Sequence, residues 1–445
     1  MKSVKMFMFG LVLMFALSLN VKAADIFDYS SLKACLETSD SICKLGANVE
    51  LDAHIEISEE VTLDLNGYNI TPSSTFNSGD SLFIVLHGGT LTVEDSSSGK
   101  NGEISTGNNE NIFVGIKMTK AGCNTDDAAT LIVNSGTIEG YNYGISGNGN
   151  PDRINTIINI NGGTVKGLSN ESSTGIYHPQ DGILYVTGGL VTGRTGIEMR
   201  AGTLAVEGGE IVGTGVPVKV SANGNGTTTD GAGIAISQHT TKKDIAVAIT
   251  GGTVKGYSAI YESNPQNNSE SDISKVEIGI IGGNFEAING GNVTVYSENL
   301  EEFIAGGNFD KTIDEDYLTS ESKLEEENGS FVAKTLVEVR ILDVTNNKVI
   351  EVKEVYSGDL VKLDIKADKG YEIDTISVVD IMVGEEIKLT DNSFTMPVYP
   401  VEVQVTFKEA IVNPATGDNI IMFGALAVVS LVVGLLSLNK LKYNN

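Results

Sequence analysis

Apolar and polar residues alternate with a period of two along much of the chain between residues 50 and 310. In one segment, Leu204 and Val206 fall on one side of an extended backbone. Their neighbours Thr203 and Glu207 fall on the other side. This alternation is typical of strands with one buried face, and no long helical stripe interrupts it. The region is therefore predicted to be β-structure.

A short phrase that opens with two small residues, usually glycines, recurs through the same region. Most copies are about 20–31 residues apart, and some about twice that, which indicates stacked supersecondary units. Paired glycines permit positive φ angles and close backbone approach, so each copy is predicted to mark a corner. The copies are Gly88-Gly89-Thr90-Leu91, Ser135-Gly136-Thr137-Ile138, Gly162-Gly163-Thr164-Val165, Gly188-Gly189-Leu190-Val191, Gly208-Gly209-Glu210-Ile211, Gly251-Gly252-Thr253-Val254, Gly282-Gly283-Asn284-Phe285 and Gly306-Gly307-Asn308-Phe309.

One short strand per repeat cannot fold alone, but stacked repeats bury a continuous apolar column and pair their backbone groups. The repeats therefore predict a parallel β-helix over residues 50–309. Val165, Ile211 and Val254 are expected to point inward. The region resembles the right-handed, pectate-lyase-like β-helix superfamily, as found in many bacterial surface proteins, and Val61–Gly67 looks like the first coil of that family.

Both open ends of such a stack need to be covered. Residues 24–49 are assigned to an N-terminal cap, in which 28–46 can form a short helix and a strand. The acidic stretch 310–332 is either a loose linker or a C-terminal cap. The cap is favoured because Tyr317-Leu318 and Phe331-Val332 can pack over the last coil.

Residues 333–408 change character, because glycines become rarer and the alternating segments lengthen. A Gly370-Tyr371 turn and a Phe394–Pro397 segment (FTMP) before the last strand resemble the small repeat modules of bacterial cell-wall proteins. The resemblance implies a stalk or spacer, with ligand binding as the alternative. Strands are expected at 336–344, 348–356, 360–367 and 401–407.

The N-terminus has the parts of a secretory signal peptide. Lys2 and Lys5 precede an apolar run, residues 6–19, and small residues lead to a cleavage position between Ala23 and Ala24. Residues 1–23 are therefore expected to be removed. An uncleaved N-terminal anchor is the alternative.

A five-residue motif near the C-terminus consists of Asn413, Pro414, Ala415, Thr416 and Gly417. It resembles the LPxTG motif of Gram-positive cell-wall sorting signals, with Asn in place of Leu. The resemblance implies that a sortase thiolate attacks the Thr416 carbonyl, that the Thr–Gly bond breaks, and that the chain is transferred to a peptidoglycan amine. The Asn leaves the class of sortase open.

The motif is followed by an apolar run, residues 420–438, and by the tail 439–445 with Lys440 and Lys442. As a helix the run would be about 28 Å long, close to the thickness of a bilayer core. The lysines predict a cytoplasmic tail, with the preceding chain outside. A retained membrane anchor is the alternative to covalent sorting, and both place the protein at the cell surface.

The formal net charge of −28 repels nucleic acid, so no nucleic-acid partner is expected. Cys35 and Cys43 are a candidate disulfide in a secreted chain, or else two small buried apolar side chains, and Cys123 is left over. No His/Cys spacing suggests a metal site, and no cofactor is expected.

The β-helix superfamily includes polysaccharide lyases and hydrolases, so the resemblance makes an enzyme one alternative. Asn124–Asp127 (NTDD) resembles an element of the pectin-hydrolysing branch, in which two acids act as general acid and base. That branch's Gly-His-Gly and Arg-Ile-Lys elements are missing, and His178 and His239 stand in His-Pro and His-Thr contexts. A lyase needs a base beside Ca²⁺-binding carboxylates. Arg194 and Arg200 can line a basic notch, but surface positions are the simpler interpretation, and no catalytic residue is assigned.

The sequence therefore predicts an all-β secreted protein, with a right-handed parallel β-helix, a small β-rich stalk module and one C-terminal transmembrane helix. It is expected in the cell wall, from a membrane-anchored precursor, as an adhesin-like module for a host or environmental ligand such as a glycan. The alternatives are a polysaccharide-degrading enzyme and a membrane-anchored structural surface protein. The expected parts are a signal peptide (1–23), an N-terminal cap (24–49), a β-helix (50–309), a cap or linker (310–332), a stalk module (333–408), a sorting motif (409–417), a transmembrane helix (420–438) and a cytoplasmic tail (439–445).

Overall fold

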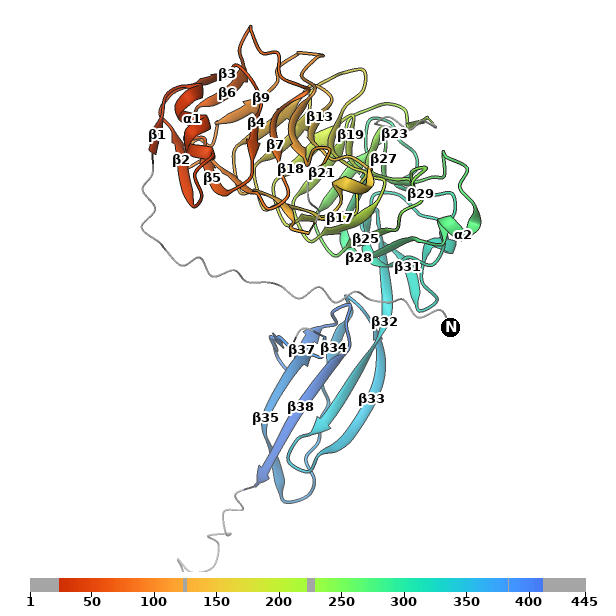
Figure 1. The fold of residues 1–445 in the computed structure, drawn as a ribbon. Helices are drawn as coiled ribbons and strands as arrows, with labels where there is room; N and C mark the ends of the chain where they lie inside the picture. The colour runs from red at the N-terminus through yellow and green to blue at the C-terminus, as the bar shows by residue number, and fades with distance from the viewer. Residues whose placement is uncertain (1–23, 123–125, 222–228, 383, 411–445) are drawn as a thin grey trace, which may run out of the picture. The chain divides into compact units, whose positions relative to one another are not determined.

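The computed structural model describes residues 24–122, 126–221, 229–382 and 384–410. These residues are mostly β-strand, as the sequence predicted. The chain divides into two compact units, with the boundary between Thr335 and Leu336 (Figure 1). The described part of the first is called the stacked unit (24–335), and that of the other the second unit (336–410).

The stacked unit is built from three ladders of parallel strands, and each turn of the chain adds one strand to each ladder. The first ladder consists of β1 (Ala24–Ile26), β2 (Ser41–Leu45), β5 (Glu60–Asp64), β8 (Thr90–Glu94), β11 (Ala129–Val133), β14 (Thr156–Ile160), β17 (Gly182–Val186), β20 (Gly202–Val206), β25 (Ile245–Ile249) and the starts of β28 (Val276–Ala287) and β30 (Ile304–Phe309).

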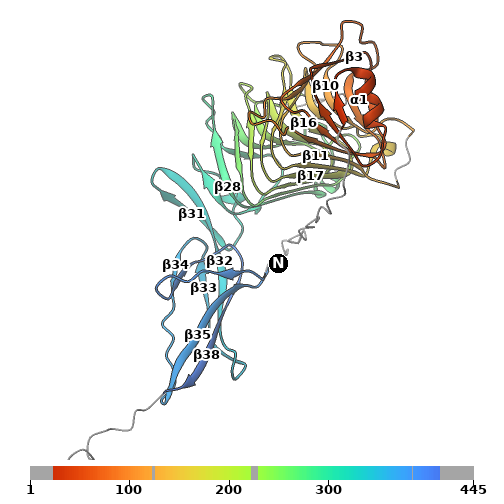
Figure 2. The ribbon, with the colours of Figure 1, turned by 90° about the vertical axis from the view of Figure 1, so that its left-hand side faces the viewer.

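The other two ladders follow the first in each turn. The second consists of β3 (Val49–Leu51), β6 (Asn69–Pro72), β9 (Glu103–Ser105), β12 (Thr137–Gly140), β15 (Thr164–Gly167), β18 (Leu190–Gly193), β21 (Glu210–Gly213), β26 (Thr253–Gly256) and the ends of β28 and β30. The third consists of β4 (Ile55–Ile57), β7 (Ser81–Val85), β10 (Val114–Met118), β13 (Tyr143–Ser146), β16 (Thr174–His178), β19 (Thr195–Met199), β24 (Ala232–Ile236), β27 (Ser258–Glu262) and β29 (Val295–Ser297). These long parallel sheets are consistent with a parallel β-helix (Figure 2).

The core of the stacked unit is a set of apolar columns that run from coil to coil. On the second ladder Val165 pairs with Val191, which pairs with Ile211 of the next strand. Ile211 in turn pairs with Val254. All four are fully buried in one apolar cluster, so the prediction that Val165, Ile211 and Val254 point inward is confirmed.

The paired glycines form the corner between the first and second ladders. A Cβ on Gly208 would lie 2.3 Å from the Thr187 carbonyl oxygen of the preceding coil, and Gly209 has a φ of 76°. Seven of the eight copies of the phrase occupy this corner. The interpretation of Gly88-Gly89 as an equivalent copy is wrong, because these glycines lead into β8 of the first ladder.

The N-terminal end of the stack carries α1 (Tyr29–Leu36), whose Leu32 and Leu36 are fully buried in the core (Figures 1 and 2). Asp28 caps this helix, since its side chain accepts a hydrogen bond from the Ser31 amide at 2.8 Å. A disulfide joins Cys35 of α1 to Cys43 of β2, with Cα atoms 5.9 Å apart. The parallel pairing already includes β1, β2 and β3, so the ladders begin within the stretch expected as a cap.

At the other end, residues 310–335 pack on the last coil. Leu318 is buried, and the Tyr317 ring in η2 (Glu315–Tyr317) lies 5.2 Å from the Phe303 ring. β32 (Ser330–Asp343) pairs antiparallel with β30 and with β31 (Ser322–Glu327). These contacts cover the end of the core. Outside the ladders the stacked unit also contains η1 (Pro151–Arg153), β22 (Lys219–Val220), β23 (Thr229–Asp230) and α2 (Glu270–Ile273).

The second unit has its own sheet and its own core. The later part of β32 pairs antiparallel with β33 and parallel with β38, and β38 pairs antiparallel with β35. Val339, Val378 and Val403 lie at the centre of its apolar cluster. The strand expected at 360–367 is shorter than predicted. Besides β32, the strands are β33 (Lys348–Tyr356), β34 (Leu360–Lys362), β35 (Tyr371–Asp380), β36 (Glu386–Ile387), β37 (Ser393–Thr395) and β38 (Val401–Glu409).

The inward and outward positions of β15 should respond differently to the same charge. We expect Val165→Asp to lower the free energy of unfolding by several kcal/mol, because it buries an unpaired carboxylate. Thr164→Asp, its outward neighbour, should change that free energy by about 0.5 kcal/mol or less. Urea unfolding followed by circular dichroism measures both. Equal effects would contradict the assignment of inward and outward faces.

The corner between β20 and β21 should tolerate no side chain at Gly208. We expect Gly208→Ala to destabilise the protein by about 1–3 kcal/mol, because its Cβ would clash with backbone of the preceding coil. Gly279 on β28 is the matched control, since a Cβ there meets nothing within 4 Å. Gly279→Ala should lie within about 0.5 kcal/mol of the wild type. The same urea titration compares the two variants.

Candidate functional site

A groove of about 390 Å³ lies on the outer face of the third ladder. Its floor comes from β10, β13 and β16, and its sides come from the segments that precede β7 and β10 and that follow β13, β16 and β24. Parallel pairing places Val114 beside Tyr143 and Ser146 beside Tyr177. The floor of the groove is therefore assembled from outward positions of three successive coils.

Aromatic rings form the floor of the groove. The Tyr143 and Tyr177 rings lie 5.4 Å apart, and Phe113 meets Tyr143 edge-on at 6.4 Å. Tyr143 and Tyr177 are buried, whereas Phe113 is half-buried. Burial raises the pKa of the Tyr177 hydroxyl well above its usual range, so this ring stays neutral. The floor is therefore apolar, uncharged and rigidly packed.

One ion pair lines the groove. The Lys117 ammonium donates to both carboxylate oxygens of Asp80, at 2.9 and 2.8 Å. Lys117 projects outward from β10, and Asp80 directly precedes β7. They are the one basic and the one acidic side chain among the described residues that line the groove, so its lining has no net charge.

The rim is made of short polar side chains. Asn148 lines the groove, and its side-chain oxygen accepts a hydrogen bond from the Asn150 amide at 3.0 Å, so its side-chain NH₂ group is the part that can donate to a ligand. On the opposite segment, Nδ1 of His239 accepts from the Thr240 hydroxyl at 2.8 Å and from the Thr241 amide at 3.4 Å. These groups can orient a ligand that both donates and accepts hydrogen bonds.

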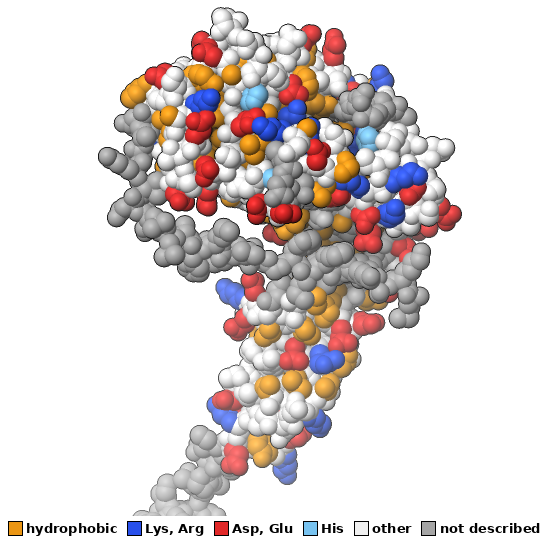
Figure 3. Space-filling view, in the orientation of Figure 1, with side chains coloured by type: hydrophobic (Ala, Val, Ile, Leu, Met, Phe, Trp, Pro, Cys, Tyr) orange, Lys and Arg blue, Asp and Glu red, His pale blue; other side chains and the backbone are white. Residues whose placement is uncertain are grey.

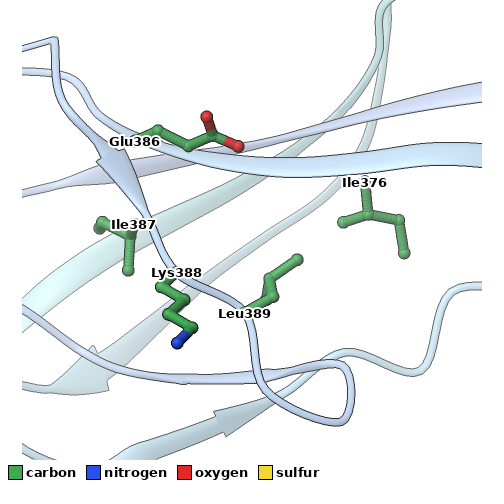
Figure 4. Close-up of a pocket in the computed structure, with 5 residues that line it drawn as sticks. All are labelled: Ile376, Glu386, Ile387, Lys388 and Leu389. Atoms are coloured by element: carbon green, nitrogen blue, oxygen red, sulfur yellow. The ribbon is translucent and has the colours of Figure 1, made fainter.

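A second, smaller cavity of about 330 Å³ lies on the second unit (Figure 4). Ile376, Ile387 and Leu389 line it together with Glu386 and Lys388. It contains no aromatic side chain and few polar groups. The groove on the third ladder is therefore the stronger candidate for a binding site.

The structure does not bring the catalytic candidates together. Asn124 and Thr125 lie outside the described residues, and Asp126 and Asp127 are exposed before β11. Arg194 binds Asp230 of β23, with Nε 2.9 Å from one carboxylate oxygen. The surface position expected for Arg200 is wrong: Arg200 is fully buried, 3.6 Å from the equally buried Glu198.

His178 is also buried, inside the stack. Its Nδ1 donates to the Ala201 carbonyl at 3.0 Å, and burial lowers its pKa to about 4. In the part of the chain that the structure describes, no three His, Cys, Asp or Glu side chains are grouped to hold a metal.

The cleavage position, at Ala23, and the motif from Asn413 to Gly417 lie outside the described residues, as does the expected span at 420–438. The described part of the chain has no helix that is long and apolar enough to cross a membrane. Comparison with models of protein families, with curated proteins and with solved structures finds no match.

Sequence reasoning missed the groove, although a second phrase marks its floor. Gly-Ile recurs in five successive coils, and the residue after each Ile faces outward. A Cβ on Gly144 would lie 2.7 Å from a methyl of Val165, which explains why glycine stands there. The copies are Val114-Gly115-Ile116-Lys117, Tyr143-Gly144-Ile145-Ser146, Thr174-Gly175-Ile176-Tyr177, Thr195-Gly196-Ile197-Glu198 and Ala232-Gly233-Ile234-Ala235.

The buried His178 should make stability depend on pH. Its pKa is about 4 in the folded chain and about 6.5 when exposed, so unfolding takes up a proton between these values. Its contribution to stability is therefore complete above pH 6.5 and is lost as the pH falls to about 4, by roughly 3 kcal/mol. We expect His178→Gln to flatten the pH dependence of the unfolding free energy by that amount.

The matched control for this measurement is Ile176→Val, a fully buried position on the same strand that carries no titratable group. It should keep the wild-type pH dependence, although it lowers stability. Urea titrations at pH 7, 5.5 and 4 compare the slopes, so a constant loss of stability in either variant does not matter. An unchanged slope in His178→Gln would contradict the burial of a neutral ring.

Proposed function

We propose that this chain is a secreted surface protein that a sortase attaches to the cell wall, and that its stacked unit serves as an adhesin-like binding module. The order of its sequence signals supports this cellular location: a signal peptide before Ala24, the motif Asn413–Gly417, an apolar run and a basic tail. The apolar run holds the precursor in the membrane. The sortase then exchanges the Thr416–Gly417 amide for one with a peptidoglycan amine, through a thioester on its own cysteine.

The groove is the observation that carries the binding function. It combines an aromatic floor with a few placed polar groups, which is the usual composition of a ligand site. The long parallel ladders support the finer assignment of the stacked unit to right-handed parallel β-helices. The separate core of residues 336–410 supports the role of stalk for the module expected at 333–408.

Covalent attachment is tested by replacing the residue whose carbonyl is attacked. We expect Thr416→Ala to leave the protein extractable from cells by detergent, whereas the wild type is released only by muralytic enzymes. The control is Thr395→Ala, an exposed position on β37 outside the motif. It should behave as the wild type. Equal release of all three proteins by detergent would show that the chain is a membrane-anchored protein.

A further inference from the structure

We propose that the groove on the third ladder holds an uncharged hexose unit of a glycan, with an apolar face of the sugar ring against Phe113 and its hydroxyls toward Lys117, Asp80 and Asn148. This inference rests on the proposed binding function and names the ligand class. Four observations lead to it: the size of the groove, its aromatic lining, its hydrogen-bonding groups and its charge.

The size of the groove favours a small rigid group. A volume of about 390 Å³ is at the lower end of ordinary ligand sites, which span about 300–1,000 Å³. Its floor cannot widen easily, because Tyr143 and Tyr177 pack against each other and Val114 in a buried cluster. A short segment of a glycan fits such a site better than a folded protein surface.

The aromatic lining favours a ligand with an apolar face. Phe113 is the half-buried member of the cluster, and it packs edge-on against Tyr143. Its ring is therefore held in place while part of it stays accessible. Sugar rings present C–H groups on one face, and an aromatic ring is a rigid apolar surface for them.

The polar groups favour hydroxyls. Lys117 donates only, the ionised Asp80 accepts only, and they lie side by side at 2.8 Å. A hydroxyl both donates and accepts, so vicinal sugar hydroxyls can bind the two groups at once without breaking the ion pair. The Asn148 side-chain NH₂ adds a further donor at the rim.

The charge balance favours an uncharged sugar. An anionic sugar would have to take Lys117 from Asp80, and it would approach a chain with a net charge of −28. Acidic side chains are spread over the face of the stacked unit in Figure 3. A cationic sugar would compete with Lys117 for the same carboxylate. Neither penalty applies to a neutral hexose.

The test uses full-length protein in detergent and three oligosaccharides that differ in charge. These are oligomers of N-acetylglucosamine (neutral), glucosamine (cationic) and galacturonate (anionic), with neutral oligomers of glucose, galactose and mannose to cover other hexoses. Calorimetry measures affinity, and mass spectrometry of the oligosaccharides detects cleavage. We expect at least one neutral oligomer to bind at least about tenfold more tightly than both charged ones.

The variants locate the binding. Phe113→Ala should weaken that binding at least about tenfold, and Phe113→Tyr should restore most of it. The matched control is Tyr296→Ala, an exposed ring on β29 of the same ladder, where it stacks on Tyr261 outside the groove. It should bind within about twofold of the wild type. Unfolding curves for all variants separate lost binding from lost folding.

Several outcomes would overturn the proposal. They differ in whether they also contradict the binding function or the attachment to the cell wall. If galacturonate or glucosamine binds most tightly and Phe113→Ala weakens that binding, the binding function stands but the ligand is not a neutral sugar. Loss of binding in Tyr296→Ala alone rejects the groove. No binding of any neutral oligomer rejects the ligand class and leaves wall attachment untouched. Cleavage of an oligomer by the wild type rejects the binding module itself, because the chain would then be an enzyme.

Discussion

The distance between neighbouring coils is the constraint on which the stacked unit depends. Parallel strands that share backbone hydrogen bonds lie about 4.7–4.9 Å apart, and each corner must keep the same spacing as the strands. At the corner between the first and second ladders this leaves no room for a side chain on Gly162 or Gly208, since a Cβ on either would lie 2.3 Å from a carbonyl oxygen of the preceding coil. Ser135 stands at the equivalent place of an earlier coil, where the preceding segment between β8 and β9 is longer. Paired glycines are therefore a steric requirement where the corners of successive coils stack closely.

The same spacing between coils also limits the size of side chains where the third ladder meets the second. Gly144 and Gly175 each face a valine methyl of the second ladder at 2.7 Å, and glycine stands at this place in the five successive coils from β10 to β24, whereas β7 has Leu82 and β27 has Ala259. Where a coil meets both steric requirements, they help to hold its strands in register. A consequence is that outward side chains line up in columns, and Lys117, Ser146 and Tyr177 become neighbours although they are far apart in sequence.

This constraint also explains what the sequence could and could not predict. Alternation and the paired glycines are local, so the β class and the inward side chains such as Val165 follow from them. The error at Gly88-Gly89 arose because two glycines report a close approach without saying which corner it occupies. The groove was missed because its rim joins Asn148 and His239 through loops of unequal length, and a repeat pattern carries no information about such loops.

The burial of Arg200 also depends on the segments between the strands, which the repeat pattern does not describe. It shows which positions of this fold are free to carry function. Lys117 and Glu198 occupy equivalent outward positions of the third ladder, yet Lys117 reaches the groove while Glu198 is fully buried beside Arg200. The ladder gives both the same direction, so the segments between the strands decide which of them meets solvent. Inward and corner positions are fixed by stacking, whereas outward side chains and connecting segments can change without disturbing it. Binding chemistry can therefore vary in this fold independently of the interactions that hold it together.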